Sequence, residues 1–463
     1  MIAGRDTLPG DNVLATVHRV WPRRTAIGGL VASAGGLLLF GPRPSDDVPA
    51  GRVILDYWEK WTGAEGEAMR LLVDEFNRTQ DTIYVRYLAI NSIDQKAMIA
   101  IAGGSPPDVI GLWNFNVPSY AEAGALLPLD DLAASAGLSR ERYADAVWPL
   151  LTHEGRQWSM ISTCGSLALY LNLDVLESAG IDPASTPRTL DDLDEMNERI
   201  IERSSDGKLE RMGFLHTEPG WWSWIWGYHF GGSLLDSTGA PTADAPKNVA
   251  AYEWVRSYPE RFGSRELLAF QSGLGFYGTA QYPFLTGKVA SVVQGPWMAN
   301  LINAFAPSLR YRAVPIPVDV GELDAAAPVG LIDGDVLVIP KGAKHPEASF
   351  EFITWLQERA RLERLAAAHG KNTPLRETST GFVENHSNGS IAVHNALASS
   401  PRAFVFPRTS VWPRYVSEFD AAFQGLWLGE QTPRAMLSGI QQTMVREIAK
   451  ERGGRRRREQ SAS

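Results

Sequence analysis

The side chains best suited to binding chemistry are flat aromatic rings at the ends of predicted strands. The chain has 15 Trp residues, and the apolar face of a Trp ring suits the C–H faces of sugars or other stacked rings. One of them, Trp297, follows a Gly-Pro turn after a short β-branched strand over 289–293. Before that strand, we expect a helix end that stops at Gly287. This arrangement holds one ring at a strand exit, either toward a ligand or within an ordinary core.

A second aromatic stretch, residues 218–232, contains four closely spaced Trp residues: Trp221, Trp222, Trp224 and Trp226. Neither a helical nor a strand period can direct all four rings into one core. Some of them must therefore face a cleft or solvent.

The elements that position the first polar groups form a β-α-β unit. Residues 53–58 are a nearly continuous apolar run of strand length, and residues 83–88 are the next strand. Between them, apolar residues recur at helical spacing, namely Met69, Leu72, Val73 and Phe76. The loop with Glu59 and Trp61 then lies at the carboxyl end of the sheet, where ligands bind in open α/β folds.

Later segments place further polar and aromatic groups at strand ends. A Gly/Pro turn leads into a strand that ends at Trp113 and Asn114. Thr189 is a suitable N-cap for a helix with Leu193 on its buried face. The strand predicted over 330–340 carries Asp333 near its start, as a candidate acceptor for a ligand hydroxyl.

Charge and length limit the classes of partner. The chain of 463 residues is long enough for two or three domains, and its formal net charge is −9. Without residues 1–50 and 446–463, the body has 32 basic and 46 acidic residues. An acidic body argues against a nucleic-acid partner.

The N-terminus predicts export. Residues 19–24 form a basic region, and residues 26–40 are an uncharged apolar run that is short for a membrane span but typical of a signal peptide. Cleavage after Ala50 or retention as an anchor both stay open. The only cysteine, Cys164, lies far from this segment, which excludes a lipoprotein anchor.

The sequence gives little support to motifs for cofactor binding, metal binding or nucleophilic catalysis. The G-x-G-x-x-G pattern over 273–278 lacks a preceding apolar strand, so dinucleotide binding is not expected. The eight His residues include no H-E-x-x-H pattern, and no metal or cofactor is expected. Cys164 could form a nucleophile group with His153 and His216, although a buried structural cysteine is the simpler interpretation.

The stretch from Tyr282 to Met298 resembles the signature of the family 1 extracellular solute-binding proteins of ABC importers, such as maltose-binding protein. It contains F-x-x-G-K-x-A, four mostly apolar residues, and then G-P-W. Four other segments are similar to the family in the same order: 103–113, 121–132, 167–182 and 345–356. The resemblance covers Val53 to Lys450.

The resemblance implies an α/β periplasmic-binding-protein fold, with two α/β lobes joined by a multi-strand hinge. The implied organisation is a signal peptide or anchor over 1–50, lobe 1 over 51–163 and 313–372, lobe 2 over 164–312 and 373–450, and a disordered basic tail over 451–463.

It also implies capture of a carbohydrate, such as an oligosaccharide or glycoside, by lobe closure. The implied partners are the permease subunits of an ABC transporter in the membrane, with the exported protein acting as a monomer and not as an enzyme. The ligand-binding residues that we expect are Glu59, Trp61, Trp113, Asn114, Trp222, Trp224, Trp297, Asp333 and Arg376.

Two other functions stay open. An exported carbohydrate-active hydrolase would need two carboxylates at a defined separation around the glycosidic bond, and the sequence specifies no such pair. A binding protein that reports to a membrane sensor would use the same lobes.

Overall fold

The computed structural model describes residues 51–462, and side chains are described up to residue 454. The predicted basic region 19–24, apolar run 26–40 and cleavage site after Ala50 lie outside the described residues. Residues 52–462 belong to one compact unit, to which the following description applies. None of the described helices is both long and apolar enough to cross a membrane.

The first lobe is built on a mixed sheet. Strands β1, β2 and β3 run parallel, whereas β12 is antiparallel to β3 and to β6. In pairing order the strands are β13 (Ala403–Val405), β12 (Gly330–Val338), β3 (Val109–Trp113), β1 (Val53–Glu59) and β2 (Ile83–Ala89), with β6 (Met160–Ser166) also paired to β12. The predicted β-α-β opening is therefore confirmed.

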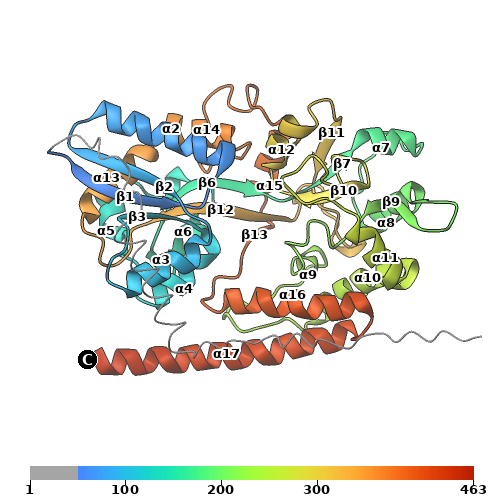
Figure 1. Cartoon of the computed structure of the whole chain (residues 1–463). Helices are drawn as coiled ribbons and strands as arrows, with labels where there is room; N and C mark the ends of the chain where they lie inside the picture. The colour runs from blue at the N-terminus through green and yellow to red at the C-terminus, as the bar shows by residue number, and fades with distance from the viewer. Residues whose placement is uncertain (1–50, 463) are drawn as a thin grey trace, which may run out of the picture. The chain divides into compact units, whose positions relative to one another are not determined.

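Helices cover both faces of this sheet. Figure 1 shows α2 and α14 above the sheet and α3 and α4 below it. The helices of this lobe are α2 (Gly63–Thr79), α3 (Ile93–Ala102), α4 (Val117–Glu122), α5 (Asp130–Ser135), α6 (Trp148–Leu151), α13 (Pro346–Leu356) and α14 (Arg359–Ala368). A short hairpin joins β4 (Thr152–His153) to β5 (Arg156–Gln157). The helical spacing predicted for α2 is confirmed, because Met69, Leu72, Val73 and Phe76 are all buried.

The second lobe has its own sheet. Its strands, in pairing order, are β11 (Tyr311–Val314), β7 (Ala168–Asn172), β10 (Val289–Gln294), β9 (Leu209–Phe214) and β8 (Glu202–Arg203). Its helices are α7 (Leu173–Ser178), α8 (Leu190–Ile200), α9 (Trp226–His229), α10 (Pro246–Phe262), α11 (Ser264–Ser272), α12 (Met298–Phe305), α16 (Trp412–Leu428) and α17 (Pro433–Ala462). Thr189 caps α8 as predicted, in a capping box with Asp192. Residues 283–287 form a turn and not the expected helix end.

Several chain segments join the lobes, and each lobe keeps its own hydrophobic core. The first crossing is at Leu167, the single residue between β6 and β7. The second runs from β11 to β12, and the third runs from β13 in the first sheet to α16 in the second lobe. Helix α15 (Ile391–Ala398) contacts β6 and β12. The predicted multi-strand hinge is thus present.

Two lobe boundaries differ from the prediction. Residues 311–314 form β11 at the edge of the second sheet, so the return crossing comes after residue 314. Strand β13, expected within lobe 2, pairs with β12 in the first sheet. A short apolar run identifies a strand, but it does not encode which strand will be its neighbour.

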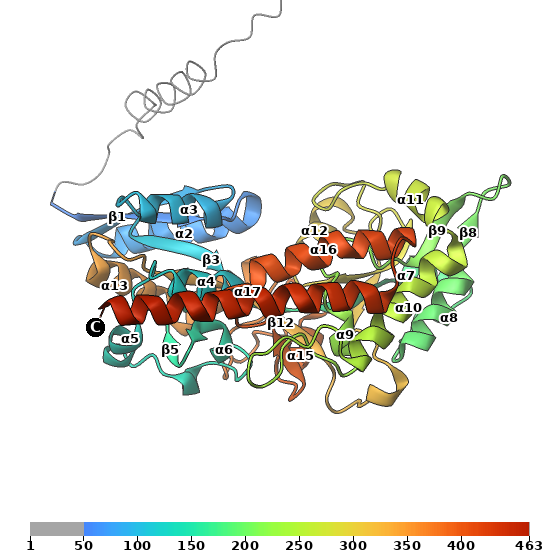
Figure 2. The same ribbon diagram turned by 90° about the horizontal axis from the view of Figure 1, so that it is seen from below.

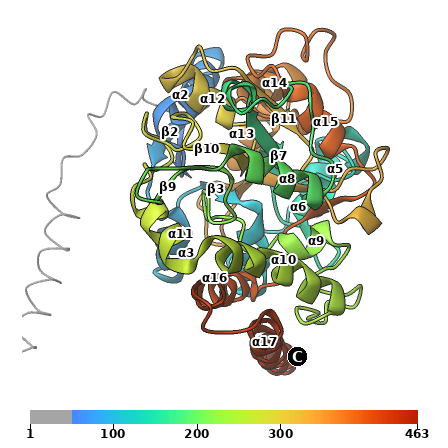
Figure 3. The same ribbon diagram turned by 90° about the vertical axis from the view of Figure 1, so that its right-hand side faces the viewer.

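The segment from residue 451 to Ala462 is helical, where we expected a disordered tail. Its Arg, Glu and Gln residues are good helix formers, and extending a helix is far less costly than nucleating one. The segment continues α17, which contacts α10 and α16. Figures 2 and 3 show α17 alongside α16, on the outer side of α10.

Adjacent leucines in α2 test the assigned buried face. Leu72 is 1% exposed and Leu71 is 56% exposed. We expect Leu72→Ala to lower the free energy of unfolding by about 2–5 kcal/mol, because it leaves a cavity in the core. Leu71→Ala should change it by less than about 0.5 kcal/mol. Urea unfolding measures both, and equal effects would contradict the assignment.

Candidate functional site

A group of polar and aromatic side chains gathers where β1 and β3 end. Because the two strands are parallel, Glu59 and Trp113 lie at the same edge of the sheet. Strand β12 runs the other way and places Asp335 directly opposite Trp113. The segment after α14 adds Lys371, which contacts Asp335. We call the residues Lys60, Asp335 and Lys371, with the Trp rings around them, the interlobe cluster.

Two buried lysines share one carboxylate at the centre of the interlobe cluster. Lys371 Nζ lies 2.7 Å from Asp335 Oδ2, and Lys60 Nζ lies 3.0 Å from Asp335 Oδ1. Thr163 also donates its hydroxyl to Asp335 Oδ2, at 2.7 Å. Burial alone would raise the pKa of Asp335, but the charges of Lys371 and Lys60 outweigh it and hold that pKa well below its usual range. Asp335 is therefore ionised at neutral pH.

The Glu59 carboxylate forms a second ion pair with Lys60. This carboxylate is fully buried, accepts a 2.5 Å hydrogen bond from the Tyr57 hydroxyl, and lies 3.2 Å from Lys60 Nζ. Gly111 leaves room for it, because a Cβ at that position would come within 1.9 Å of Glu59 Oε2. Glu59 is thus enclosed and supports the lysine, instead of presenting a free carboxylate as we expected.

Three Trp rings surround the two ammonium groups. Lys60 Nζ lies 4.7 Å from the ring centre of Trp61 and 5.4 Å from that of Trp113. Lys371 Nζ lies 5.6 Å from the ring centres of both Trp61 and Trp297. Since Trp297 belongs to the second lobe, this cluster is built from both lobes.

Local packing fixes the Trp297 ring. Its indole nitrogen donates to Gln294 Oε1 at 3.0 Å. The ring folds over Gly295, where a Cβ would come within 2.2 Å of it. Pro296 packs against Gly165, where a Cβ would lie 3.0 Å from the proline ring. The Gly-Pro-Trp turn therefore places the Trp297 ring next to Gly165 in β6, the strand that leads into the first crossing.

Asn114 and Asp333 form a neighbouring pair. The Asn114 side chain is fully buried and donates to Asp333 Oδ1 at 2.7 Å and to the Gly334 carbonyl at 3.0 Å. Burial, followed by the charge of Asp335, raises the pKa of Asp333 to about 7. The two aspartates, two positions apart in β12, therefore titrate in separate pH ranges.

Two predicted residues do not join this group. Trp224 is 1% exposed, and its ring packs in the core of lobe 2 against Phe406 and Trp412. Arg376 lies on the exposed surface, where its guanidinium pairs with Asp145 at 2.9 Å. The loop around Trp224 has no helical or strand period, so the pattern could not tell which rings face inward.

The other three Trp residues of the 218–232 stretch also differ in how deeply they are buried. Trp226 is buried in the core of lobe 2. Trp222 is partly buried, and its indole nitrogen has no hydrogen-bond partner among the described residues. Trp221 is 44% exposed and packs against Tyr277 with ring centres 4.9 Å apart.

The sequence argument missed Lys60, Asp335 and Lys371. The clearest signal was the position of Lys60 between Glu59 and Trp61, in a loop already assigned to the ligand edge of the sheet. Lys371 precedes a segment recognised as a lobe crossing, but nothing in the sequence pairs it with Asp335.

The possible cysteine nucleophile is not assembled. Cys164 is buried, its thiol faces the Asn372 carbonyl at 3.7 Å, and burial raises its pKa to about 12. His153 binds Glu122 in the first lobe, whereas His216 lies among aromatic rings of the second. Cys164 is therefore a structural residue.

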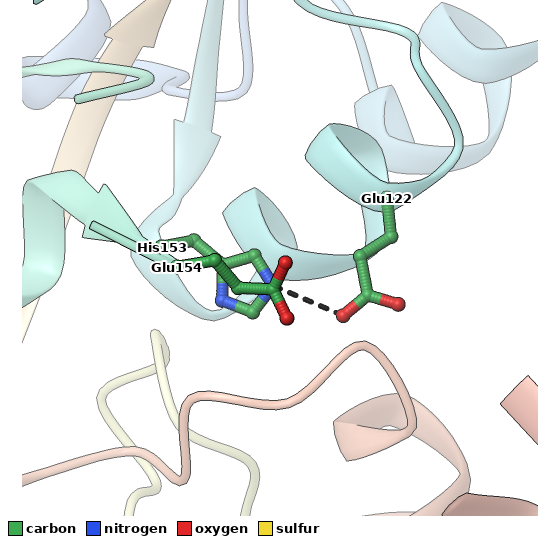
Figure 4. A group of neighbouring side chains, drawn as sticks. All are labelled: Glu122, His153 and Glu154. Carbon is green, nitrogen blue, oxygen red and sulfur yellow. Dashed lines mark hydrogen bonds and ion pairs between the residues drawn. The ribbon is translucent and has the colours of Figure 1, made fainter. Parts of the chain in front are cut away.

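One group within the described residues has ligand atoms close enough to hold a metal ion: Glu122, His153 and Glu154. Figure 4 shows them at the ends of α4 and of the β4 strand, facing the segments of the other lobe. His153 Nε2 and Glu122 Oε1 lie 3.0 Å apart, so these two groups already satisfy each other as a hydrogen-bonded pair. No independent feature points to a cation here, and we assign none.

Known proteins are similar to this chain in sequence and in architecture. Residues 60–360 match the family model for bacterial extracellular solute-binding proteins. The arabinooligosaccharide-binding protein of Bacillus subtilis is 23% identical over 322 residues, which cover 64% of this chain and 71% of the relative. The sn-glycerol-3-phosphate-binding periplasmic protein of Pectobacterium atrosepticum is 23% identical over 458 residues, which cover 92% and 95%.

Solved structures agree on the fold. A protein whose structure was solved with mannobiose bound has a TM-score of 0.74 at 26% identity, over 84% of this chain and 99% of its own. The sugar-binding protein of Xanthomonas citri has a TM-score of 0.69 at 20% identity, over 86% and 98%. These matches confirm the two-lobed fold. Because the family model covers most of both lobes, the chain belongs to the bacterial extracellular solute-binding proteins.

Proposed function

We propose that this protein captures a carbohydrate between its lobes and delivers it to the permease of an ABC importer. The observation that carries the proposal is the interlobe cluster, in which Trp rings from both lobes surround ionised hydrogen-bonding groups. Relatives named as arabinooligosaccharide-binding and maltotriose-binding proteins, and a structural neighbour solved with mannobiose or mannotriose bound, support an oligosaccharide or glycoside as ligand.

The cluster suits a sugar for two reasons. Lys60 and Lys371 offer N–H donors and Asp335 offers acceptor lone pairs, so the hydroxyls of a neutral ligand can both donate and accept. The flat rings of Trp61, Trp113 and Trp297 cover the apolar C–H faces. The carboxylates of Asp335 and Glu59 together balance the two lysines, so the site does not require a charged ligand.

Binding energy would drive lobe closure. A ligand that touches Trp297 in lobe 2 and the Asp335 network in lobe 1 gains all its contacts only when the lobes are close. It therefore shifts the equilibrium toward the closed state. The permease, or a membrane sensor, would recognise that state on the outer surfaces of the lobes.

We further propose that the protein is exported through residues 1–50, either cleaved or retained as an anchor, and works as a monomer. It acts as a binding protein and not as an enzyme. Asp333 and Asp335 have well-separated pKa values, a feature that acid and base pairs of hydrolases share. However, the charges of Lys371 and Lys60 hold the pKa of Asp335 well below its usual range, which makes it too weak a base for proton transfer.

Replacing Trp297 tests the ligand site. We expect Trp297→Ala to weaken binding of the best oligosaccharide ligand at least about tenfold, because one stacked ring contributes more than about 1 kcal/mol. Calorimetry with mannobiose, mannotriose, maltotriose and arabino-oligosaccharides measures the effect. Trp158→Ala is the control, since that ring lies on the first lobe and donates to the His153 carbonyl. Equal affinities of Trp297→Ala and the wild type, with both folded, would rule out the assigned role.

The pH dependence of binding tests Asp333. If its carboxylate accepts a ligand hydroxyl, affinity should rise up to about tenfold from about pH 6 to about pH 8, as the group with a pKa of about 7 loses its proton. Glu218 in lobe 2 also has a pKa raised to about 7, mainly by burial. Asp333→Asn separates the two groups: it should remove the pH dependence and leave the affinity near its acidic value. A profile unchanged in that variant would contradict the assignment.

A further inference from the structure

Two backbone segments from different lobes approach closely beside the interlobe cluster. In lobe 1, Gly370 follows α14 and directly precedes Lys371. In lobe 2, Pro296 follows β10 and directly precedes Trp297. A Cβ at Gly370 would lie only 3.1 Å from the Pro296 carbonyl oxygen. The backbone segments that carry Lys371 and Trp297 therefore meet across the boundary between the lobes.

The side chain of Asn388 joins these two segments. It lies between α14 and α15 and is fully buried. Its amide nitrogen donates to the Pro296 carbonyl at 3.0 Å and to the Gly370 carbonyl at 3.1 Å. Its amide oxygen accepts from the Ser390 backbone N–H at 2.9 Å, which is consistent with only one orientation of the amide. Each lobe thus receives one of the two amide N–H groups.

The residues around Asn388 are also bonded to both lobes. The Asn388 backbone N–H donates to His386 Nδ1 at 3.0 Å, so the other ring nitrogen, Nε2, carries the proton of the neutral imidazole. Nε2 donates to the Lys371 carbonyl of lobe 1 at 3.1 Å. The Ser390 hydroxyl accepts from the Ala313 N–H, in β11 of lobe 2, at 3.1 Å. These bonds hold the Asn388 amide in a fixed position between the lobes.

A second amide makes a direct bond between the lobes. Asn300 in α12 donates to the Ala368 carbonyl, at the end of α14, at 3.0 Å. Figures 1 and 3 show these two helices close together. Asn300 is only partly buried, so water can replace its bond more easily than those of Asn388.

Opening of the lobes at this point would leave Asn388 with only one of its two carbonyls. The bond that is lost on opening favours the closed arrangement by the net value of a buried hydrogen bond. That value corresponds to a factor of about three to ten in the ratio of closed to open protein.

We propose that Asn388 is a positioning residue that holds the Trp297 turn of lobe 2 against the Lys371 segment of lobe 1, and thereby sets the balance between open and closed lobes. This role rests on the proposed function, because it contributes to capture of the ligand by lobe closure. Asn388 is fully buried and both of its amide N–H groups are bonded to the protein. It therefore acts on the ligand only through Trp297 and Lys371.

The distance between the lobes in the ligand-free, full-length protein tests this role. Spin labels at Ile99→Cys in α3 and Leu268→Cys in α11 report on lobes 1 and 2, because these side chains are 71% and 42% exposed and the native Cys164 is buried. Double electron–electron resonance should show a larger population of long distances for Asn388→Ala than for the otherwise unchanged labelled protein. Calorimetry with mannotriose and maltotriose should show an affinity about three- to tenfold lower, since the apparent affinity follows the population of the closed state.

Asn248 provides a matched control. Its side chain is also fully buried, and its amide nitrogen also donates to two backbone carbonyls, those of Ser233 at 2.7 Å and Thr242 at 2.8 Å. Both carbonyls belong to lobe 2. Asn248→Ala should therefore lower Tm but leave the interlobe distances and the sugar affinity unchanged. A purely structural role of Asn388 would give this same pattern in Asn388→Ala and would overturn the proposal.

Two further variants extend the test. If Asn388→Ala does not fold, Asn388→Ser replaces it, because a single hydroxyl donor can bond only one of the two carbonyls. Asn300→Ala should shift the distances in the same direction by a smaller amount. Interlobe distances in Asn388→Ser equal to those of the wild type would contradict the role of Asn388, even if both sugars bind. Longer distances in a protein that binds neither sugar would support that role and argue against the proposed function instead.

Discussion

The buried carboxylate of Asp335 between Lys60 and Lys371 is the interaction on which the site depends. It joins three distant parts of the chain: the loop after β1, the hinge strand β12 and the segment that follows α14. Each charge is buried, and removing one partner of such a pair typically costs about 3–5 kcal/mol because it leaves an uncompensated charge. The lobe edge is therefore rigid, and the Trp rings around it keep a fixed position.

That network belongs to a chain divided into two lobes. Each lobe has a separate core, and the chain crosses between them at Leu167, between β11 and β12, and between β13 and α16. Lobe 1 contributes a charged network that is already assembled, and lobe 2 contributes the Trp297 ring at the end of β10. A ligand need not organise either part, so more of its binding energy is available for closure.

Much of the fold could be predicted from local patterns. The apolar run of β1, the helical spacing of α2 and the capping residue Thr189 each encode their own element. What the sequence could not supply were long-range pairings. The neighbours of β11 and β13, and the contact between Lys371 and Asp335, join residues that are far apart in the chain. Trp221, Trp222 and Trp224 lie in a loop without a period, so Trp224 was misassigned to the ligand.

The central claim is that the protein binds a carbohydrate between its lobes without altering it. The most direct measurement is a thermal melt of the protein with a panel of oligosaccharides, glycosides and glycerophosphodiesters, followed by mass spectrometry of the ligand released from each hit. At about 100-fold excess over Kd, a ligand adds about 2.7 kcal/mol to stability, which raises Tm by several degrees. We predict such a shift with an oligosaccharide that is recovered intact. A hit that is recovered cleaved, or a panel in which only charged non-sugar ligands raise Tm, would contradict this account.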